Sequence, residues 1–205
     1  MTDTTVIEEQ TLNRAIVTWV RGKLGQQVGD GECWTLVNDA LNEKGAKDSY
    51  DFGAVSKTAD YVWGTEITDF KTLQPGDILQ FKDFVEHDAT VVDITFKDGG
   101  GFVEGDADAP VPTKRPHHSA IVNSSPDGEG RIEILEQNFG SIGKKVQKNT
   151  IHTKDLIKPT ETTNETHYNE DSKKNEVATV KRTVKITITG TLKAYRPVKK
   201  PEERE

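Results

Sequence analysis

The chain has one cysteine, Cys33, which stands in the stretch GDGECWTLV between a glycine-rich turn and the start of a predicted helix. A thiol in the first turn of a helix lies at the positive end of the helix dipole, which lowers its pKa and raises the thiolate fraction. Gly29 and Gly31 let backbone N–H groups approach a substrate carbonyl closely. These residues predict a cysteine nucleophile, and the alternative is an unreactive thiol packed in a core.

A cysteine hydrolase also needs a base within hydrogen-bond reach and a group that orients the base. Of the five histidines, only His117 and His118 open an apolar strand, in HHSAIV. Glu136 and Asn138 are two residues apart in EILEQN, so they share one face of the next predicted strand. Adjacent antiparallel strands can place His118 opposite Glu136 or Asn138. The order of these residues along the chain suits cysteine hydrolase chemistry in a helix-then-sheet fold.

Hydrophobic periodicity predicts the elements that position these residues. Apolar side chains at helical spacing, each series followed by a glycine, predict helices over 7–24 and 32–44. Alternating segments and turn signals predict a long loop at 97–114 and strands at 74–81, 89–96, 118–125, 131–138, 144–152 and 180–197. We therefore expect an α+β fold in which N-terminal helices pack on an antiparallel sheet of five to six strands.

The domain organisation follows from length and composition. With 205 residues, of which 33% are hydrophobic, the chain predicts one domain, over residues 1–197. Residues 158–176 have almost no apolar content and predict a mobile polar insertion. Residues 198–205 are expected to form a disordered tail.

Several motifs in a fixed order resemble the permuted papain-like cysteine hydrolases of the NlpC/P60 and CHAP type. The closest likeness is to the cysteine-proteinase-like domain at the C-terminus of a fungal actin-patch protein and to small bacterial relatives of that domain. The motifs are GDGECW at 29–34, YVWG at 61–64, PGDILQF at 75–81, HHSAIV at 117–122, EQN at 136–138 and AYRP at 194–197. The resemblance implies a papain-like fold.

Carried over position by position, the resemblance makes Cys33 the nucleophile and His118 the base. It places Glu136 and Asn138 where CHAP domains have the residues that orient the histidine. One departure stands beside the nucleophile, because CHAP domains usually have Gly-Gln-Cys and this chain has Glu32 before Cys33. A carboxylate that faced the thiol would raise the pKa of the thiol.

Four further residues are candidates for substrate binding, and each has a structural alternative. Trp34 and Trp63 can line a substrate groove, although aromatic residues more often pack in a core. His117 points away from the site if the strand is regular. Gln27 can supply an oxyanion donor, as the glutamine of papain-type enzymes does, or can simply be solvated.

Charge and composition exclude several classes of partner. Residues 1–143 carry a net charge of −13 and residues 144–205 carry +6, without the aromatic interleaving of a nucleic-acid site. The sequence lacks a secretory signal, an apolar run long enough to span a bilayer, and the ligand spacing of a zinc or calcium site. We expect a monomer that needs no cofactor or metal, binds neither nucleic acid nor membrane, and is cytoplasmic or exported without a classical leader.

Two functions remain open at this stage. The first is a cysteine-dependent amide hydrolase, a thiol peptidase or amidase, whose substrate is a peptide or is peptidoglycan-like. The second is a catalytically inactive papain-like module that binds peptides. Retention of Cys33, His118, Glu136 and Asn138 in order favours the enzyme, whereas Glu32 beside the thiol favours the binding module.

Overall fold

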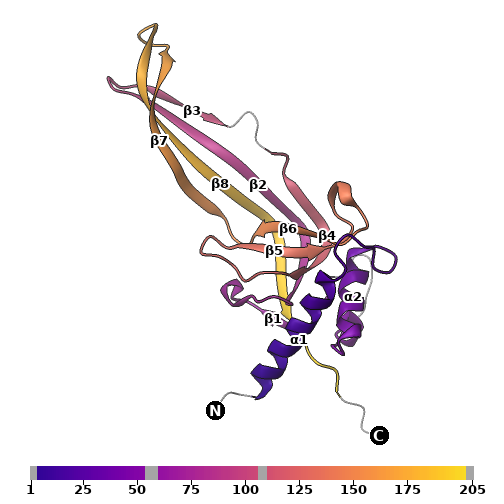
Figure 1. Ribbon diagram of the computed structural model, residues 1–205. Coiled ribbons are helices and arrows are strands. Elements are labelled where there is room, and N and C mark those ends of the chain that lie inside the picture. The colour runs from indigo at the N-terminus through magenta and orange to yellow at the C-terminus, as the bar shows by residue number, and fades with distance from the viewer. Residues whose placement is uncertain (1–3, 54–59, 106–109, 202–205) are drawn as a thin grey trace. The chain divides into compact units, whose positions relative to one another are not determined.

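The structure is a computed structural model that describes residues 4–53, 60–105 and 110–201 (Figure 1). Within these ranges the chain forms two α-helices, three short 3-10 helices and eight strands. The helices are α1 (Thr4–Arg21), α2 (Cys33–Glu43), η1 (Ser49–Asp51), η2 (Phe70–Thr72) and η3 (Gly140–Ile142). The strands are β1 (Thr65–Ile67), β2 (Ile78–Phe96), β3 (Gly101–Gly105), β4 (Thr113–Val122), β5 (Arg131–Glu136), β6 (Gln147–His152), β7 (Leu156–Asn169) and β8 (Lys174–Arg196).

Both predicted helices are present, and each buries its apolar stripe. α1 ends at Arg21 rather than at Leu24, which is exposed, and α2 begins at Cys33. The two stripes share one core with residues of β2, β4, β5 and β8, so the helices pack on the sheet as the sequence predicts. Neither helix, as far as its residues are described, combines the length and the apolarity that a bilayer crossing requires. The buried helical residues are Leu12, Ile16, Val17, Val20, Leu36, Val37, Ala40 and Leu41.

The strands form one sheet in the order β1-β8-β2-β4-β5-β6, with β3 paired to β2 and β7 paired to β8. The pairs β1–β8, β2–β3, β4–β5, β5–β6 and β7–β8 are antiparallel. The described residues thus form eight strands, so the expected five to six is wrong. Ile121 pairs with Leu135 and Val122 with Ile134, and this register brings Glu136, the last residue of β5, opposite Ala120 near the end of β4.

The missed strands lie where polar composition predicted loops. β3 falls inside the expected loop at 97–114, and β7 with the start of β8 covers residues 158–176, where a mobile polar insertion is expected. In this hairpin Glu165 and His167 are partly buried while Thr166 and Tyr168 are exposed, so an alternating pattern is built from polar side chains. Paired backbone groups and threonine, which favours strands, stabilise a segment that lacks apolar residues.

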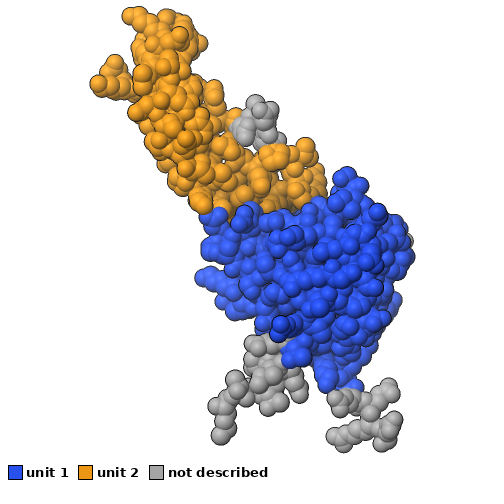
Figure 2. Space-filling model, in the orientation of Figure 1, with its two compact units in different colours: residues 1–84, 115–153, 190–205 blue, residues 85–114, 154–189 orange. Residues whose placement is uncertain are grey.

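The chain divides into two compact units, which Figure 2 colours separately. The single domain over residues 1–197 stays a prediction. Unit 1 comprises residues 1–84, 115–153 and 190–205 and holds both helices. Unit 2 comprises residues 85–114 and 154–189 and has its own small core of Ile94, Phe96, Ala178 and Val180.

The predicted disordered tail is partly held in place. Lys199 forms a β-bridge with Ala46, and the Lys200 ammonium donates a hydrogen bond to Asn42. Residues 202–205 of the predicted tail lie outside the described residues.

Candidate active site

Cys33 is the first residue of α2, as the sequence predicts. The preceding residue, Glu32, has extended backbone angles and does not cap the helix with its side chain. The first N–H groups of a helix have no intrahelical partner, and together with the helix dipole they favour negative charge at this position. Gly29 and Gly31 have φ values of 54° and 87°, so the turn before the thiol needs residues without a Cβ.

The side chains of Cys33 and His118 interact, and each shifts the pKa of the other. Burial raises the pKa of the Cys33 thiol, but the His118 contact and the backbone N–H groups of Ser119 and Trp34 outweigh it, so the pKa lies below its ordinary value. Burial lowers the pKa of His118, yet hydrogen bonds with Cys33 and Glu136 raise it to about 9. Both shifts favour a thiolate–imidazolium pair at neutral pH.

Glu136 occupies the other side of the His118 ring. His118 Nε2 lies 2.8 Å from Glu136 Oε2, although its N–H is not aimed straight at that oxygen. Because Nε2 faces the carboxylate, Nδ1 is the ring nitrogen left for the thiol. In the register of β4 and β5 this is a diagonal contact, which the long glutamate side chain can span.

Arg115 fixes the carboxylate of Glu136 from the opposite side. Its guanidinium binds both carboxylate oxygens, with Nε 2.9 Å from Oε2 and Nη2 2.7 Å from Oε1, and Asn149 donates to Oε1 at 2.7 Å. Burial raises the pKa of Glu136, but the Arg115 and His118 contacts lower it to about 2. Glu136 is therefore ionised at neutral pH although it is fully buried.

The Arg115 side chain is also buried, with 1% of its surface exposed. Its guanidinium carbon lies 4.1 Å from the centroid of the Phe139 ring and 5.4 Å from that of Phe81. These rings contact the cation through their faces, which partly replaces lost solvation. Sequence reasoning missed Arg115, because an arginine in TKRPHH carries no spacing signal that distinguishes it from a surface residue.

The side chain of Asn138 contacts Glu32, and among the described contacts none joins it to His118, the histidine that it is predicted to orient. β5 ends at Glu136, and Asn138 has a left-handed φ of 61°, so the strand alternation on which the prediction rested does not reach it. Its side-chain amide donates to Glu32 Oε2 at 2.7 Å. The structure thus brings Cys33, His118 and Glu136 together and places Asn138 beside Glu32, the residue before Cys33.

The four candidates for substrate binding differ in burial and in the residues that they contact. Trp63 is fully buried and donates to Gln80 Oε1 at 3.1 Å, so it has no surface for a ligand and is a core residue. Trp34 is half-buried and donates to Ser49 Oγ at 3.0 Å. The His117 ring packs edge-on against Tyr61, with centroids 5.0 Å apart. Gln27 is exposed, and its amide donates to the backbone oxygen of Gly29 at 3.1 Å.

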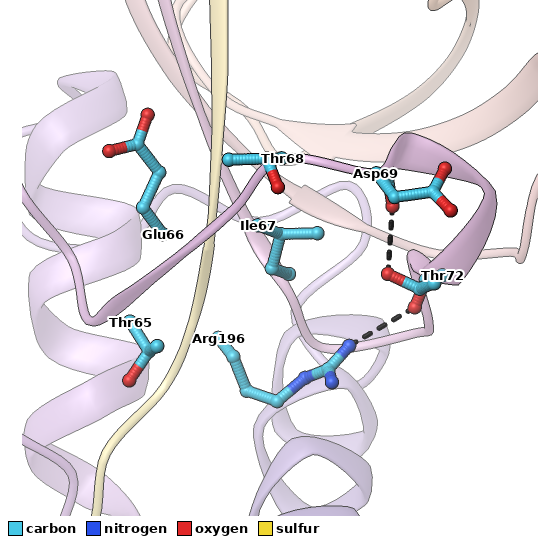
Figure 3. Close-up of a pocket in the computed structure, with 7 residues that line it drawn as sticks. All are labelled: Thr65, Glu66, Ile67, Thr68, Asp69, Thr72 and Arg196. Carbon is cyan, nitrogen blue, oxygen red and sulfur yellow. Dashed lines mark hydrogen bonds between the residues drawn. The ribbon is translucent and has the colours of Figure 1, made fainter.

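A cavity of about 310 Å³ lies elsewhere in unit 1 and shares no lining residue with this cluster (Figure 3). The Arg196 guanidinium lines it and donates to the backbone oxygen of Thr72 at 3.1 Å. The same guanidinium binds Asp77, which satisfies its charge. The described residues contain no cluster of three or more histidine, cysteine, aspartate or glutamate side chains placed to hold a metal ion.

Comparisons with known proteins agree with the resemblance in the sequence. Residues 3–160 match the model of a family described as the AIM3/BBC1 cysteine proteinase-fold domain. The curated protein "Altered inheritance of mitochondria protein 3" of Debaryomyces hansenii is 27% identical over 169 residues, which are 75% of this chain and 16% of that protein. The chain therefore spans a small part of the length of this relative, and no solved structure matches it significantly.

The predicted likeness to the cysteine-proteinase-like domain of an actin-patch protein is thereby confirmed, whereas the finer likeness to CHAP and NlpC/P60 enzymes stays a prediction. Since the family model covers most of the sequence, the chain belongs to the family of AIM3/BBC1 cysteine proteinase-fold domains.

Proposed function

We propose that the chain is a cysteine-dependent amide hydrolase, a peptidase or amidase related in mechanism to the CHAP and NlpC/P60 enzymes. The observation that carries this proposal is the contact series from Cys33 through His118 to Glu136. The pKa shifts have the directions that nucleophilic catalysis requires: the pKa of the Cys33 thiol is lowered, that of the His118 imidazole is raised to about 9, and that of the Glu136 carboxyl is lowered to about 2.

In the proposed reaction the Cys33 thiolate attacks the carbonyl carbon of an amide bond. The negative charge on the carbonyl oxygen is stabilised by the backbone N–H of Cys33 at the start of α2. The His118 imidazolium gives its proton to the leaving nitrogen, the C–N bond breaks, and a thioester remains on Cys33. His118 then takes a proton from water, which attacks the thioester and releases the acid and the thiolate.

The test is the rate at which iodoacetamide alkylates Cys33 as a function of pH. Because Cys33 is the chain's one thiol, the intact mass reports on this site alone. We expect fast alkylation well below the free thiol pKa of about 8.5. We also expect His118→Ala to return the rate to an ordinary thiol titration, while His152→Ala, a histidine from β6, leaves the profile unchanged. A slow rate that follows an ordinary titration in the unmodified chain would falsify the catalytic proposal.

The second candidate function is an inactive papain-like module that binds a peptide. It is supported by an aromatic surface near the thiol, where Tyr50 is 64% exposed and its ring packs edge-on against Trp34 at a centroid distance of 5.6 Å. A peptide screen separates the two functions. Cleavage by the unmodified chain that Cys33→Ser abolishes identifies the enzyme. Peptide binding that is equal for both chains, without cleavage, identifies the module.

A further inference from the structure

The loop that carries the nucleophile is fastened along its length by the segment that connects β5 to β6. Backbone hydrogen bonds join Gly25 to Val146 at 2.9 Å and Val146 to Gln26 at 2.8 Å. The buried side chain of Gln137 accepts from the Val28 N–H at 2.8 Å and donates to the Val28 and Glu32 carbonyl oxygens at 3.0 Å each. The position of Cys33 therefore depends on residues that lie more than a hundred positions later in the sequence.

The same connection also binds the one charged side chain that adjoins the nucleophile in sequence, Glu32. Lys144 Nζ lies 3.0 Å from Glu32 Oε1, and Asn138 Nδ2 lies 2.7 Å from Glu32 Oε2, so both carboxylate oxygens have a partner. Lys144 Nζ also donates to the backbone oxygen of Asp30 at 3.0 Å. One lysine thus contacts two residues of the loop, on either side of Gly31.

Gly31 makes this arrangement sterically possible. A Cβ added at Gly31 would lie 2.7 Å from Cβ and from Cδ of Lys144, so the aliphatic part of the lysine side chain lies flat against the glycine backbone. Any residue other than glycine at position 31 would displace it. The lysine side chain is therefore seated on the loop and does not merely extend past it into solvent.

The ion pair between Lys144 and Glu32 matters for Cys33 because Glu32 is negatively charged. A carboxylate next to a thiolate disfavours the ionised thiol, because two like charges at short range repel each other. Here the carboxylate is bound by a cation on one oxygen and by an amide on the other. The negative charge of Glu32, which would oppose ionisation of Cys33, is thereby offset by the positive charge of Lys144.

We propose that Lys144 is a positioning residue of the site, which neutralises Glu32 and ties the nucleophile loop to the β5–β6 connection. The proposal deepens the proposed function and rests on it. Two titratable groups from other elements interact with Cys33: His118, from β4, and Tyr61, from the segment before β1. Burial and the negative charge of Cys33 raise the pKa of Tyr61, so the phenol stays neutral and leaves the balance between Glu32 and Lys144 unaltered.

The experiment compares the pH profile of Cys33 alkylation among matched variants. We expect Lys144→Met to slow alkylation near pH 6 by about two- to fivefold and to move the profile to higher pH, a size typical of a partly exposed ion pair. Lys145→Met removes the same charge one position along the chain and should leave the profile unchanged. Lys144→Arg should restore most of the rate, because the cation is kept.

The double variant Lys144→Met, Glu32→Gln tests whether the lysine acts through the glutamate. We expect it to react as Glu32→Gln alone does, since no carboxylate then remains to be neutralised. We also expect 1 M salt to shrink the Lys144→Met effect, because exposed charges are screened.

Two outcomes would overturn this assignment: Lys144→Met reacting as Lys145→Met does, or Lys144→Met slowing the reaction equally with and without Glu32. Either outcome leaves the proposed function intact if the unmodified chain retains its fast low-pH reaction. Loss of that reaction in the unmodified chain counts against the proposed function itself.

Discussion

At the scale of single residues, the site is a series of groups of alternating charge, in which His118, Glu136 and Arg115 are buried and Cys33 is partly exposed. The contacts run from Cys33 to His118, Glu136 and Arg115, and the pKa shifts of the first two favour a thiolate beside an imidazolium. Burying any one of these charges alone is costly, and each is offset by its neighbour. Arg115 ends the series and makes it electrically neutral.

Replacing Arg115 by methionine is expected to destabilise the chain by about 3 to 5 kcal/mol, because Glu136 would stay buried without its bidentate partner. The double variant Arg115→Met, Glu136→Gln carries no buried charge from this pair and should recover most of that loss. Urea unfolding at pH 7, followed by circular dichroism, measures both. Equal losses in the single and double variants would show that the arginine acts through packing on Phe139 rather than through charge.

Sequence reasoning reached part of this site, and physical causes explain the rest. Cys33 was predictable because a glycine turn and a helical apolar pattern meet at that residue. His118 and Glu136 were predictable from strand alternation, which holds as far as the end of β5. Strand alternation does not extend to Asn138, because its backbone is left-handed, a conformation that asparagine adopts more readily than most residues.

At the scale of elements, the β5–β6 connection has a larger structural role than its length suggests. Gln137 is fully buried and satisfies three backbone groups of the nucleophile loop, so the loop is stabilised by a side chain rather than by a strand partner. Buried backbone groups left without partners cost about 1 to 3 kcal/mol each.

Gln137→Ala is therefore expected to release the loop. We expect faster hydrogen exchange at the Val28 amide, slower Cys33 alkylation and a loss of stability of about 1 to 3 kcal/mol. Gln26→Ala is the matched control, since the amide of Gln26 is exposed and contacts the Gly22 carbonyl of the preceding turn. Unchanged exchange at Val28 in the Gln137 variant would argue that backbone pairing with Val146 suffices to hold the loop.

Element prediction succeeded where apolar periodicity is strong and failed where strands are polar. Both helices bury regular apolar stripes, so the sequence identifies them well. The β7–β8 hairpin was missed because its inward positions include Glu165 and His167, with Arg182 paired to Glu165 at 2.6 Å. The inward face of this hairpin carries ion pairs and threonines, so residues 158–176 show no alternation of apolar and polar residues.

At the scale of the whole molecule, each unit contains one glutamate whose pKa lies at about 2. Glu136 in unit 1 is buried against Arg115, and its burial raises the pKa less than its partners lower it. Glu165 in unit 2 owes its low pKa first to the hydrogen bond from Arg182, in a partly exposed setting. Solvent screens the second pair far more than the first.

The pH dependence of stability should reflect this contrast. A carboxyl group whose folded pKa is depressed contributes stability that is present above its unfolded pKa, about 4.3, and is lost as the pH falls through the folded pKa of about 2. We expect the free energy of unfolding to fall across this window, and the Arg115→Met, Glu136→Gln variant to flatten the fall markedly. Glu165→Gln should reduce this fall in the free energy of unfolding only slightly, and 0.5 M salt should remove the difference between Glu165→Gln and the unmodified chain. A larger change from Glu165→Gln than from the double variant would contradict this assignment.

The thiol of Cys33 also has a consequence for oxidation chemistry. A thiolate of lowered pKa reacts readily with peroxide to form a sulfenic acid, which a second cysteine often resolves as a disulfide. The 205 residues supply no second cysteine. Within these residues, a sulfenic acid at Cys33 can condense with a backbone nitrogen to a sulfenamide, react with a thiol supplied from elsewhere, such as glutathione, or be oxidised irreversibly to the sulfinic acid. The same protonation state that suits Cys33 to acyl transfer makes it dependent on the reducing capacity of its surroundings.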